Sequence, residues 1–150
     1  MAKTQNINCE NVKRLTKCLA GDISEKYQID SIIAIARGGI IPARYLATYL
    51  NVRKIYTIGV QFYSDVDKTF KVPHVYQQLP KNLPVTDFFL ICDDIVDSGE
   101  SMGVVINQLT NLGVKRYITC ALHYKPKSTY KPTFYGEKLD NNVWAKYDWE

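Results

Sequence analysis

Three aspartates and a run of small hydroxyl residues stand close together in the middle of the chain. Asp93 and Asp94 directly follow the apolar run 88–92, and Asp97 precedes residues 98–101, which read Ser-Gly-Glu-Ser. Backbone N–H groups at the start of a helix, with hydroxyls and a glycine beside them, form a cradle for a phosphate. Carboxylates beside such a cradle are tolerated when they accept hydroxyl groups of a sugar or bind a bridging divalent cation. The pattern therefore indicates a site for a phosphorylated ligand.

A plain helix cap is the alternative interpretation of the same residues. Ser98 or Ser101 would cap the helix, and the aspartates would favour its positive end. This explains Asp97 and one serine, but it does not explain why Asp93 and Asp94 stand at the end of a buried strand. We therefore favour a ligand site.

A second polar turn follows another apolar run. Arg37, Gly38 and Gly39 come directly after residues 31–36. Paired glycines let the backbone approach a ligand closely, and an arginine can pair with a phosphate. An ordinary strand-to-helix turn would have the same composition, so the significance of this segment depends on its position. Ligands of parallel α/β sheets bind beyond the carboxyl ends of the strands, and both polar turns are expected at that edge.

Alternating strand and helix signals position these turns. Apolar residues at helical spacing predict a helix over residues 8–27, and helix-forming residues after Pro42 predict another over 43–50. A third helix is expected at 102–112, and strands are expected at 31–36, 54–62, 88–92 and 116–124. Residues 64–84 lack periodicity and contain prolines, which predicts a long loop. The order predicts a single α/β domain over residues 1–150, with a mostly parallel sheet flanked by helices.

Composition excludes several classes of protein. The chain has 150 residues, of which 46% are hydrophobic and 23% are charged, as in ordinary globular domains. No apolar run approaches the ~20 residues of a membrane span. The net charge is +4, but the lysines and arginines are scattered, so we expect no nucleic-acid partner. The 4 cysteines show no metal-binding spacing, which favours reduced thiols and a cytoplasmic protein.

Together these segments resemble the type I phosphoribosyltransferases. Residues 93–101 resemble the loop of that family that binds 5-phosphoribosyl-1-pyrophosphate (PRPP), and residues 37–39 resemble its pyrophosphate loop. Three short segments near the C-terminus, at 125–126, 143–145 and 148–150, resemble the 6-oxopurine branch, the xanthine-guanine and hypoxanthine enzymes. The resemblance covers residues 29–150.

The resemblance implies a role for individual residues. Asp97 would be the catalytic acid/base at N7 of the purine, and Asp94 would contact Mg²⁺ while Asp93 meets the ribose hydroxyls. The residues implied in PRPP binding are Arg37, Gly38, Gly39, Lys68, Asp93, Asp94, Asp97, Ser98, Gly99, Glu100 and Ser101. Those implied in purine binding are Asp97, Lys125, Trp144 and Ala145.

The implied activity is purine salvage, in which a 6-oxopurine and PRPP give a nucleoside 5′-monophosphate and pyrophosphate. The fold would carry a mobile loop at 64–84 and a small C-terminal hood over the base, in a homodimer or homotetramer without membrane contact. Two alternatives stay open: a PRPP-sensing regulator on the same fold, and an enzyme for adenine or a pyrimidine. Two residues depart from the family pattern: Lys68 stands where relatives carry arginine, and Glu100 must turn its carboxylate to solvent.

Overall fold

The computed structural model describes residues 3–64 and 71–150. The helices are α1 (Cys9–Ser24), α2 (Ile40–Tyr49) and α3 (Glu100–Leu112). The strands are β1 (Lys3–Ile7), β2 (Ser31–Ala36), β3 (Lys54–Ser64), β4 (Lys71–Gln77), β5 (Phe89–Val96), β6 (Tyr117–Tyr124), β7 (Phe134–Lys138) and β8 (Val143–Tyr147).

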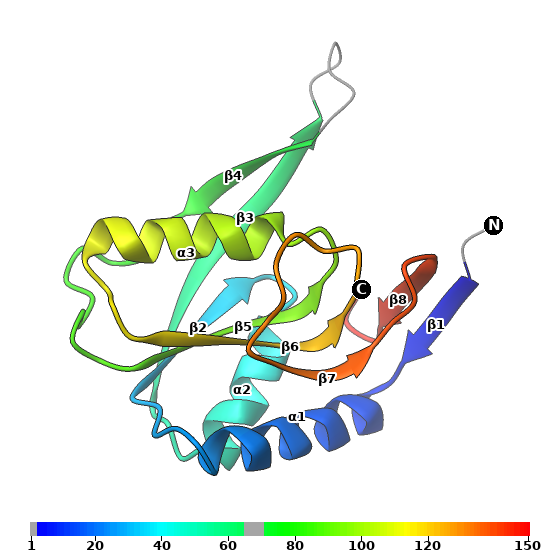
Figure 1. The fold of residues 1–150 in the computed structure, drawn as a ribbon, viewed down its shortest axis with the longest axis horizontal. Coiled ribbons are helices and arrows are strands. Elements are labelled where there is room, and N and C mark those ends of the chain that lie inside the picture. Colours follow the sequence, from blue (N-terminus) through cyan, green and yellow to red (C-terminus); the bar gives the residue numbers. More distant parts are fainter. Residues whose placement is uncertain (1–2, 65–70) are drawn as a thin grey trace.

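The main sheet contains six strands in the order β4-β3-β2-β5-β6-β7. All neighbours in it are parallel except β3 and β4, which form an antiparallel hairpin. Helices α1 and α2 cover one face and α3 covers the other (Figure 1). The expected α/β fold with a mostly parallel sheet is therefore confirmed.

Two apolar cores lie on the two faces of this sheet. Strand β2 is buried along its whole length, as expected for a central parallel strand that is covered on both faces. Its alternate residues enter different cores, so that Ile32 packs with the α1 and α2 side while Ile33 packs with the α3 side. The two cores hold the carboxyl ends of β2 and β5 in fixed positions.

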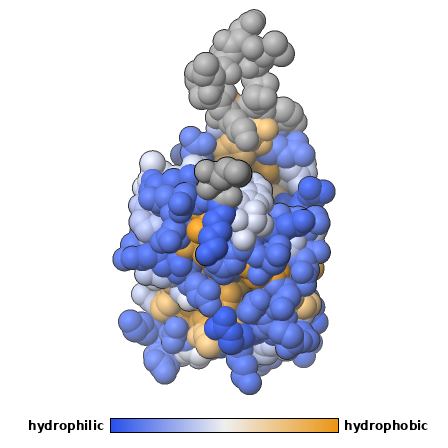
Figure 2. Space-filling model, turned by 90° about the vertical axis from the view of Figure 1, so that its right-hand side faces the viewer, coloured by the Kyte–Doolittle hydropathy of each residue, from blue (hydrophilic) through white to orange (hydrophobic). Residues whose placement is uncertain are grey.

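The first and last strands form a separate small sheet, which we call the hood. Strand β1 pairs in parallel with β8, from Lys3 opposite Val143 to Ile7 opposite Tyr147. The hood lies beside the carboxyl ends of the main sheet, at the right of Figure 1. The face that carries it is mainly hydrophilic, with small apolar patches (Figure 2).

Several sequence-based boundaries were wrong. Strand β5 does not end at residue 92 but continues to Val96, because its pairing with β6 continues to Val96 opposite Tyr124. The predicted loop at 64–84 contains strand β4, whose pairing with β3 supplies the regularity that the sequence does not show. Helix α1 ends at Ser24, and α2 already begins at Ile40. Lys68 lies outside the described residues.

Strands β1, β7 and β8 were not predicted at all. β1 exposes four of its five residues, so its sequence carries no alternating apolar pattern. Its partner in the hood lies near the opposite end of the chain. Among the described residues, no helix is long and apolar enough to cross a membrane.

Candidate active site

A cavity of about 270 Å³ opens at the carboxyl ends of β2 and β5. The sequence-predicted residues that line it are Arg37, Gly38, Asp93, Asp94, Asp97, Ser98, Gly99 and Ser101. The two polar turns therefore meet at one edge of the sheet, as their positions in the sequence predicted. Helices α2 and α3 both begin at this edge, and their positive ends favour an anion there.

The carboxylates of Asp93 and Asp94 lie side by side and are mostly buried. An oxygen of Asp93 accepts a hydrogen bond from the Asp94 amide at 2.8 Å, and an oxygen of Asp94 accepts one from the Ile95 amide at 2.7 Å. Burial raises the pKa of both groups, and for Asp93 the neighbouring Asp94 charge raises it further. A cation or hydroxyl donors at these oxygens would stabilise the ionised pair.

These two residues fit a magnesium ion that is shared with a ligand. Carboxylate oxygens are its preferred protein ligands, and Mg²⁺ is commonly bound by one or two carboxylates plus substrate phosphates. Within residues 3–64 and 71–150, no group of three or more His, Cys, Asp or Glu side chains forms a complete metal site. The acid pair itself fits an ion that is also bound by substrate phosphates.

At the turn from β5 into α3, the Ser98 hydroxyl accepts a hydrogen bond from the Glu100 amide at 3.3 Å. Gly99 has a left-handed φ of 88°, and no side chain caps the helix at Gly99 in the described structure. The Ser98 carbonyl accepts hydrogen bonds from the amide and the hydroxyl of Thr129, at 3.0 and 2.9 Å. Glu100 is exposed and does not line the cavity, as its place in the loop required. Ser98 thus bonds to the first turn of α3 as the cap interpretation expects, and the cavity beside the turn favours a ligand site in addition.

Asp97 lies between two lysines of the segment that follows β6. The Lys125 ammonium donates to one oxygen of Asp97 at 3.2 Å, and the Lys127 ammonium lies 3.1 Å from the other. The side chain of Lys125 is only 4% exposed, so the alternative of a solvated lysine is wrong. Sequence reasoning missed Lys127, whose only signal was its position two residues after Lys125.

Comparisons with known proteins agree with this geometry. A model of the phosphoribosyl transferase domain matches residues 5–149. The chain belongs to the phosphoribosyltransferase family. It is 25% identical over 147 residues to a xanthine-guanine phosphoribosyltransferase of Idiomarina loihiensis, covering 96% of this chain and 85% of the relative. It is 28% identical over 145 residues to the enzyme of that name from Gluconobacter oxydans, covering 96% and 83%.

A solved structure gives the same result. The purine phosphoribosyltransferase of Pyrococcus horikoshii matches this phosphoribosyltransferase with a TM-score of 0.86 and 30% identity. The match covers 99% of this chain and 94% of the other. The mixed α/β fold predicted from the sequence is therefore that of a solved purine phosphoribosyltransferase.

Some predicted site residues lie apart from the cavity. Trp144 is 55% exposed on the hood, and Ala145 pairs with Gln5 of β1. Gly39 packs beneath the turn instead, because a Cβ there would lie 2.4 Å from the Cys92 carbonyl oxygen. Gly39 is thus required for close packing of α2 against the sheet.

The C-terminal residues of the phosphoribosyltransferase form a part of the site that the sequence did not assign. Trp149 and Glu150 line a second cavity of about 440 Å³, together with Arg37, Gly38 and Asp94 of the first cavity and two isoleucines of α2. Burial raises the pKa of the Glu150 carboxyl, and the nearby Asp94 charge adds to this effect. The second cavity therefore adjoins the acid pair from the hood side.

Gly38 leaves room for the Asp94 carboxylate. A Cβ at Gly38 would lie 2.2 Å from an oxygen of Asp94, so Gly38→Ala must displace that side chain. We expect the affinity for PRPP in the presence of Mg²⁺ to fall about 10-fold or more, the equivalent of ~1.4 kcal/mol, as measured by calorimetry. Gly21→Ala is the control, because the space around Gly21 in α1 is open. Equal PRPP affinity of the Gly38→Ala and wild-type proteins would contradict the assignment.

Proposed function

We propose that this phosphoribosyltransferase transfers the 5-phosphoribosyl group from PRPP to a 6-oxopurine, giving the nucleoside 5′-monophosphate and pyrophosphate. One observation carries the proposal: Asp97 and the buried Lys125 form an ion pair beside the phosphate loop. A purine with an oxygen at position six presents an acceptor for the lysine and an N–H for the carboxylate. The relatives named xanthine-guanine phosphoribosyltransferase and the purine phosphoribosyltransferase structure support this substrate class.

The reaction breaks one bond and forms another at the same carbon. The bond from ribose C1 to the pyrophosphate oxygen breaks, and pyrophosphate leaves with the electron pair. Purine N9 then bonds to C1, and Asp97 takes the proton from N7 so that the product is neutral in the ring. We assign the 5′-phosphate to residues 98–101 at the start of α3, and the pyrophosphate to Arg37 and Gly38 at the start of α2.

Enzymes of this family use Mg²⁺ together with PRPP, and we assign the ion to Asp94, with Asp93 beside it. When bound, it offsets the charge of the pyrophosphate as the leaving group departs. We also assign the ribose hydroxyls to Asp93. The base would lie against Lys125, with Trp144 and Ala145 of β8 on its hood side.

Turnover with different bases tests the proposal. Guanine, xanthine, hypoxanthine and adenine are each supplied with PRPP and Mg²⁺, and mononucleotide is measured. Formation of oxopurine mononucleotides supports the proposal. A protein that binds PRPP but converts no base would instead be a PRPP-sensing regulator, which neither the family match nor the named relatives favour.

Removal of divalent cation should abolish this turnover. We assign the cation to Asp93 and Asp94, two mostly buried carboxylates whose pKa values are raised by burial. With excess chelator we expect mononucleotide formation to fall to background and to return when Mg²⁺ is restored. Full activity in chelator would show that Asp93 and Asp94 do not act through a metal.

We also propose that the enzyme works as a homo-oligomer in the cytoplasm. The outer side of α2 exposes Ile40, Ile41 and Tyr49, which a second copy would cover. The free thiols of Cys9 and Cys18 are exposed, which suits a reducing compartment. Light scattering of the purified protein measures the oligomeric state.

A further inference from the structure

We propose that Tyr147 and Trp149 are positioning residues for Asp94. Tyr147 acts on the backbone carbonyl of Asp94, and Trp149 acts on its carboxylate. His123 is the buried anchor that holds Tyr147 in place. The inference rests on the proposed function, because it assigns Asp94 to the metal-bound PRPP. It gives the C-terminal segment a role in the PRPP half of the site, in addition to the base half.

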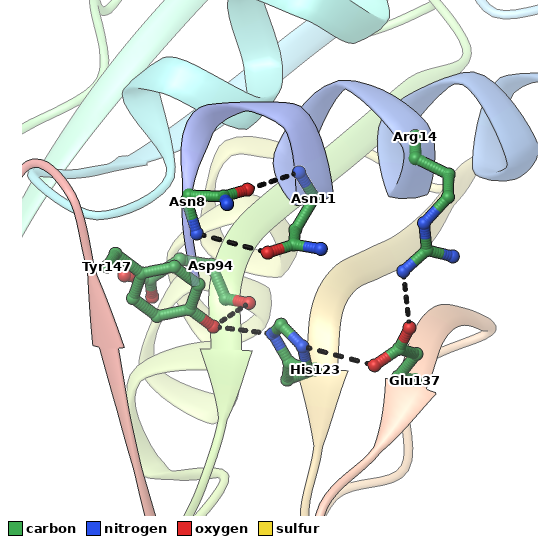
Figure 3. A network of polar contacts seen from close by, with 7 residues as sticks. All are labelled: Asn8, Asn11, Arg14, Asp94, His123, Glu137 and Tyr147. Carbon is green, nitrogen blue, oxygen red and sulfur yellow. Dashed lines mark hydrogen bonds and ion pairs between the residues drawn. The ribbon is translucent and has the colours of Figure 1, made fainter. Parts of the chain in front are cut away.

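The Tyr147 hydroxyl lies at the centre of a buried polar network (Figure 3). It donates a hydrogen bond to the Asp94 carbonyl at 3.1 Å and lies 2.8 Å from Nδ1 of His123. Tyr147 is 2% exposed and His123 is 1% exposed, so water does not compete for these groups. The network joins β8 of the hood to β5 and β6 of the main sheet.

The protons in this network can be assigned. The single hydroxyl proton of Tyr147 goes to Asp94, so the Tyr147 oxygen must accept a hydrogen bond from Nδ1–H of His123. Burial lowers the pKa of His123 to about 4, so the ring is neutral near pH 7 and carries its proton on Nδ1. Nε2 lies 3.8 Å from Glu137, whose other oxygen is held by Arg14 at 2.8 Å. His123 is therefore a fixed donor.

The Asp94 carbonyl needs such a support because β5 is no longer paired with β2 at this position. The pairing of β2 with β5 ends at Ala34 opposite Cys92, just before the acid pair. Beyond that position the Asp94 carbonyl is held by a side chain from the hood and not by a β2 amide. The position of the acid pair thus depends on the hood.

Trp149 packs on Tyr147 and lines the second cavity together with Asp94. Its ring stacks on Tyr147 with 4.7 Å between centroids and 6° between planes. The indole N–H is buried and has no acceptor in good hydrogen-bond geometry among the described residues. Trp149 is therefore close enough to steady the carboxylate.

Variants that remove one polar group at a time test the proposal. Tyr147→Phe and Trp149→Phe keep the aromatic stack but lose the O–H and the N–H. His123→Leu removes the anchor, whereas His123→Asn keeps a donor at the place of Nδ1. Thr16→Val is the control, because its buried hydroxyl bonds only to carbonyls within α1. For each protein, calorimetry measures PRPP binding against Mg²⁺ concentration, and steady-state kinetics give kcat and both KM values.

We expect Tyr147→Phe and His123→Leu to weaken Mg²⁺-dependent PRPP binding about 10-fold, because an unpaired buried carbonyl is costly. The KM for the base should change less than twofold, and His123→Asn should restore most of the PRPP affinity. Trp149→Phe should require more Mg²⁺ for half-maximal PRPP binding. Loss of thermal stability with unchanged PRPP binding would overturn the inference, and so would an equal loss of PRPP and base affinity. A wild-type protein that does not bind PRPP would overturn the proposed function itself.

Discussion

Replacing Asp97 by asparagine is expected to lower kcat by about 10²–10⁴-fold, the usual contribution of general acid–base catalysis. Asparagine has nearly the same shape and can still accept hydrogen bonds from Lys125, but its amide cannot take a proton from N7. The affinity for PRPP should change much less, because the phosphate and metal contacts belong to other residues. Single-turnover kinetics with saturating PRPP and guanine would measure the effect on the chemical step.

Asp22→Asn provides the matched control for this substitution. Asp22 is an exposed aspartate in α1, on the opposite side of the sheet from α3, and it should leave kcat unchanged. If Asp97→Asn turned over like the wild type, Asp97 would be a partner for the lysines and not the acid/base group.

The choice of base should depend strongly on Lys125. A protonated lysine has three donors and no acceptor, so it pairs with the oxygen at position six of guanine, xanthine or hypoxanthine. Adenine would place an amino group against a buried ammonium, since the Lys125 side chain is only 4% exposed. Sites built to hydrogen-bond their substrate can discriminate by about 10⁴-fold, and we expect kcat/KM for adenine to be lower by up to that factor.

Lys125→Ala should remove most of this preference by weakening oxopurine use while changing adenine use little. Lys127→Ala is the control, because Lys127 is half-exposed and contacts only the other oxygen of Asp97. It should lower turnover modestly without altering the ratio between bases. A wild-type protein that used adenine as well as guanine would refute the role of Lys125.

Local patterns predicted the elements whose buried faces leave a regular apolar pattern in the sequence. The uninterrupted apolar run of β2 and the helical spacing of Val12, Leu15 and Leu19 in α1 are visible in the sequence because burial selects residue types. Strand β1 gave no such signal, since most of it is exposed and its pairing with β8 is distant. Strand β4 was missed for a different reason, because its regularity comes from the hairpin with the neighbouring strand β3 and not from an alternating sequence pattern.

The site residues differ in the same way, because some are brought together by local sequence and others by distant strands. Asp93, Asp94 and residues 98–101 are contiguous with one strand–helix turn, so their proximity follows from the local sequence. Lys127 and Tyr147 reach the site only because of how β6 and β8 are placed, and a lone tyrosine near a chain terminus carries no motif. The predicted roles of Trp144, Ala145 and Lys68 rest on the family resemblance and stay predictions.

The pairing of β1 with β8 also bears on the order in which the site can form. These strands are among the most distant partners in the described chain, so closing them costs more chain entropy than forming the β2–β5 pair or the α3 turn. A folding chain can therefore complete the phosphate cradle while its hood is still open. Because the Asp94 carbonyl depends on Tyr147 from the hood, the ability to hold an anion would precede the ability to perform transfer. Catalytic competence would then be the last property that the folding protein acquires.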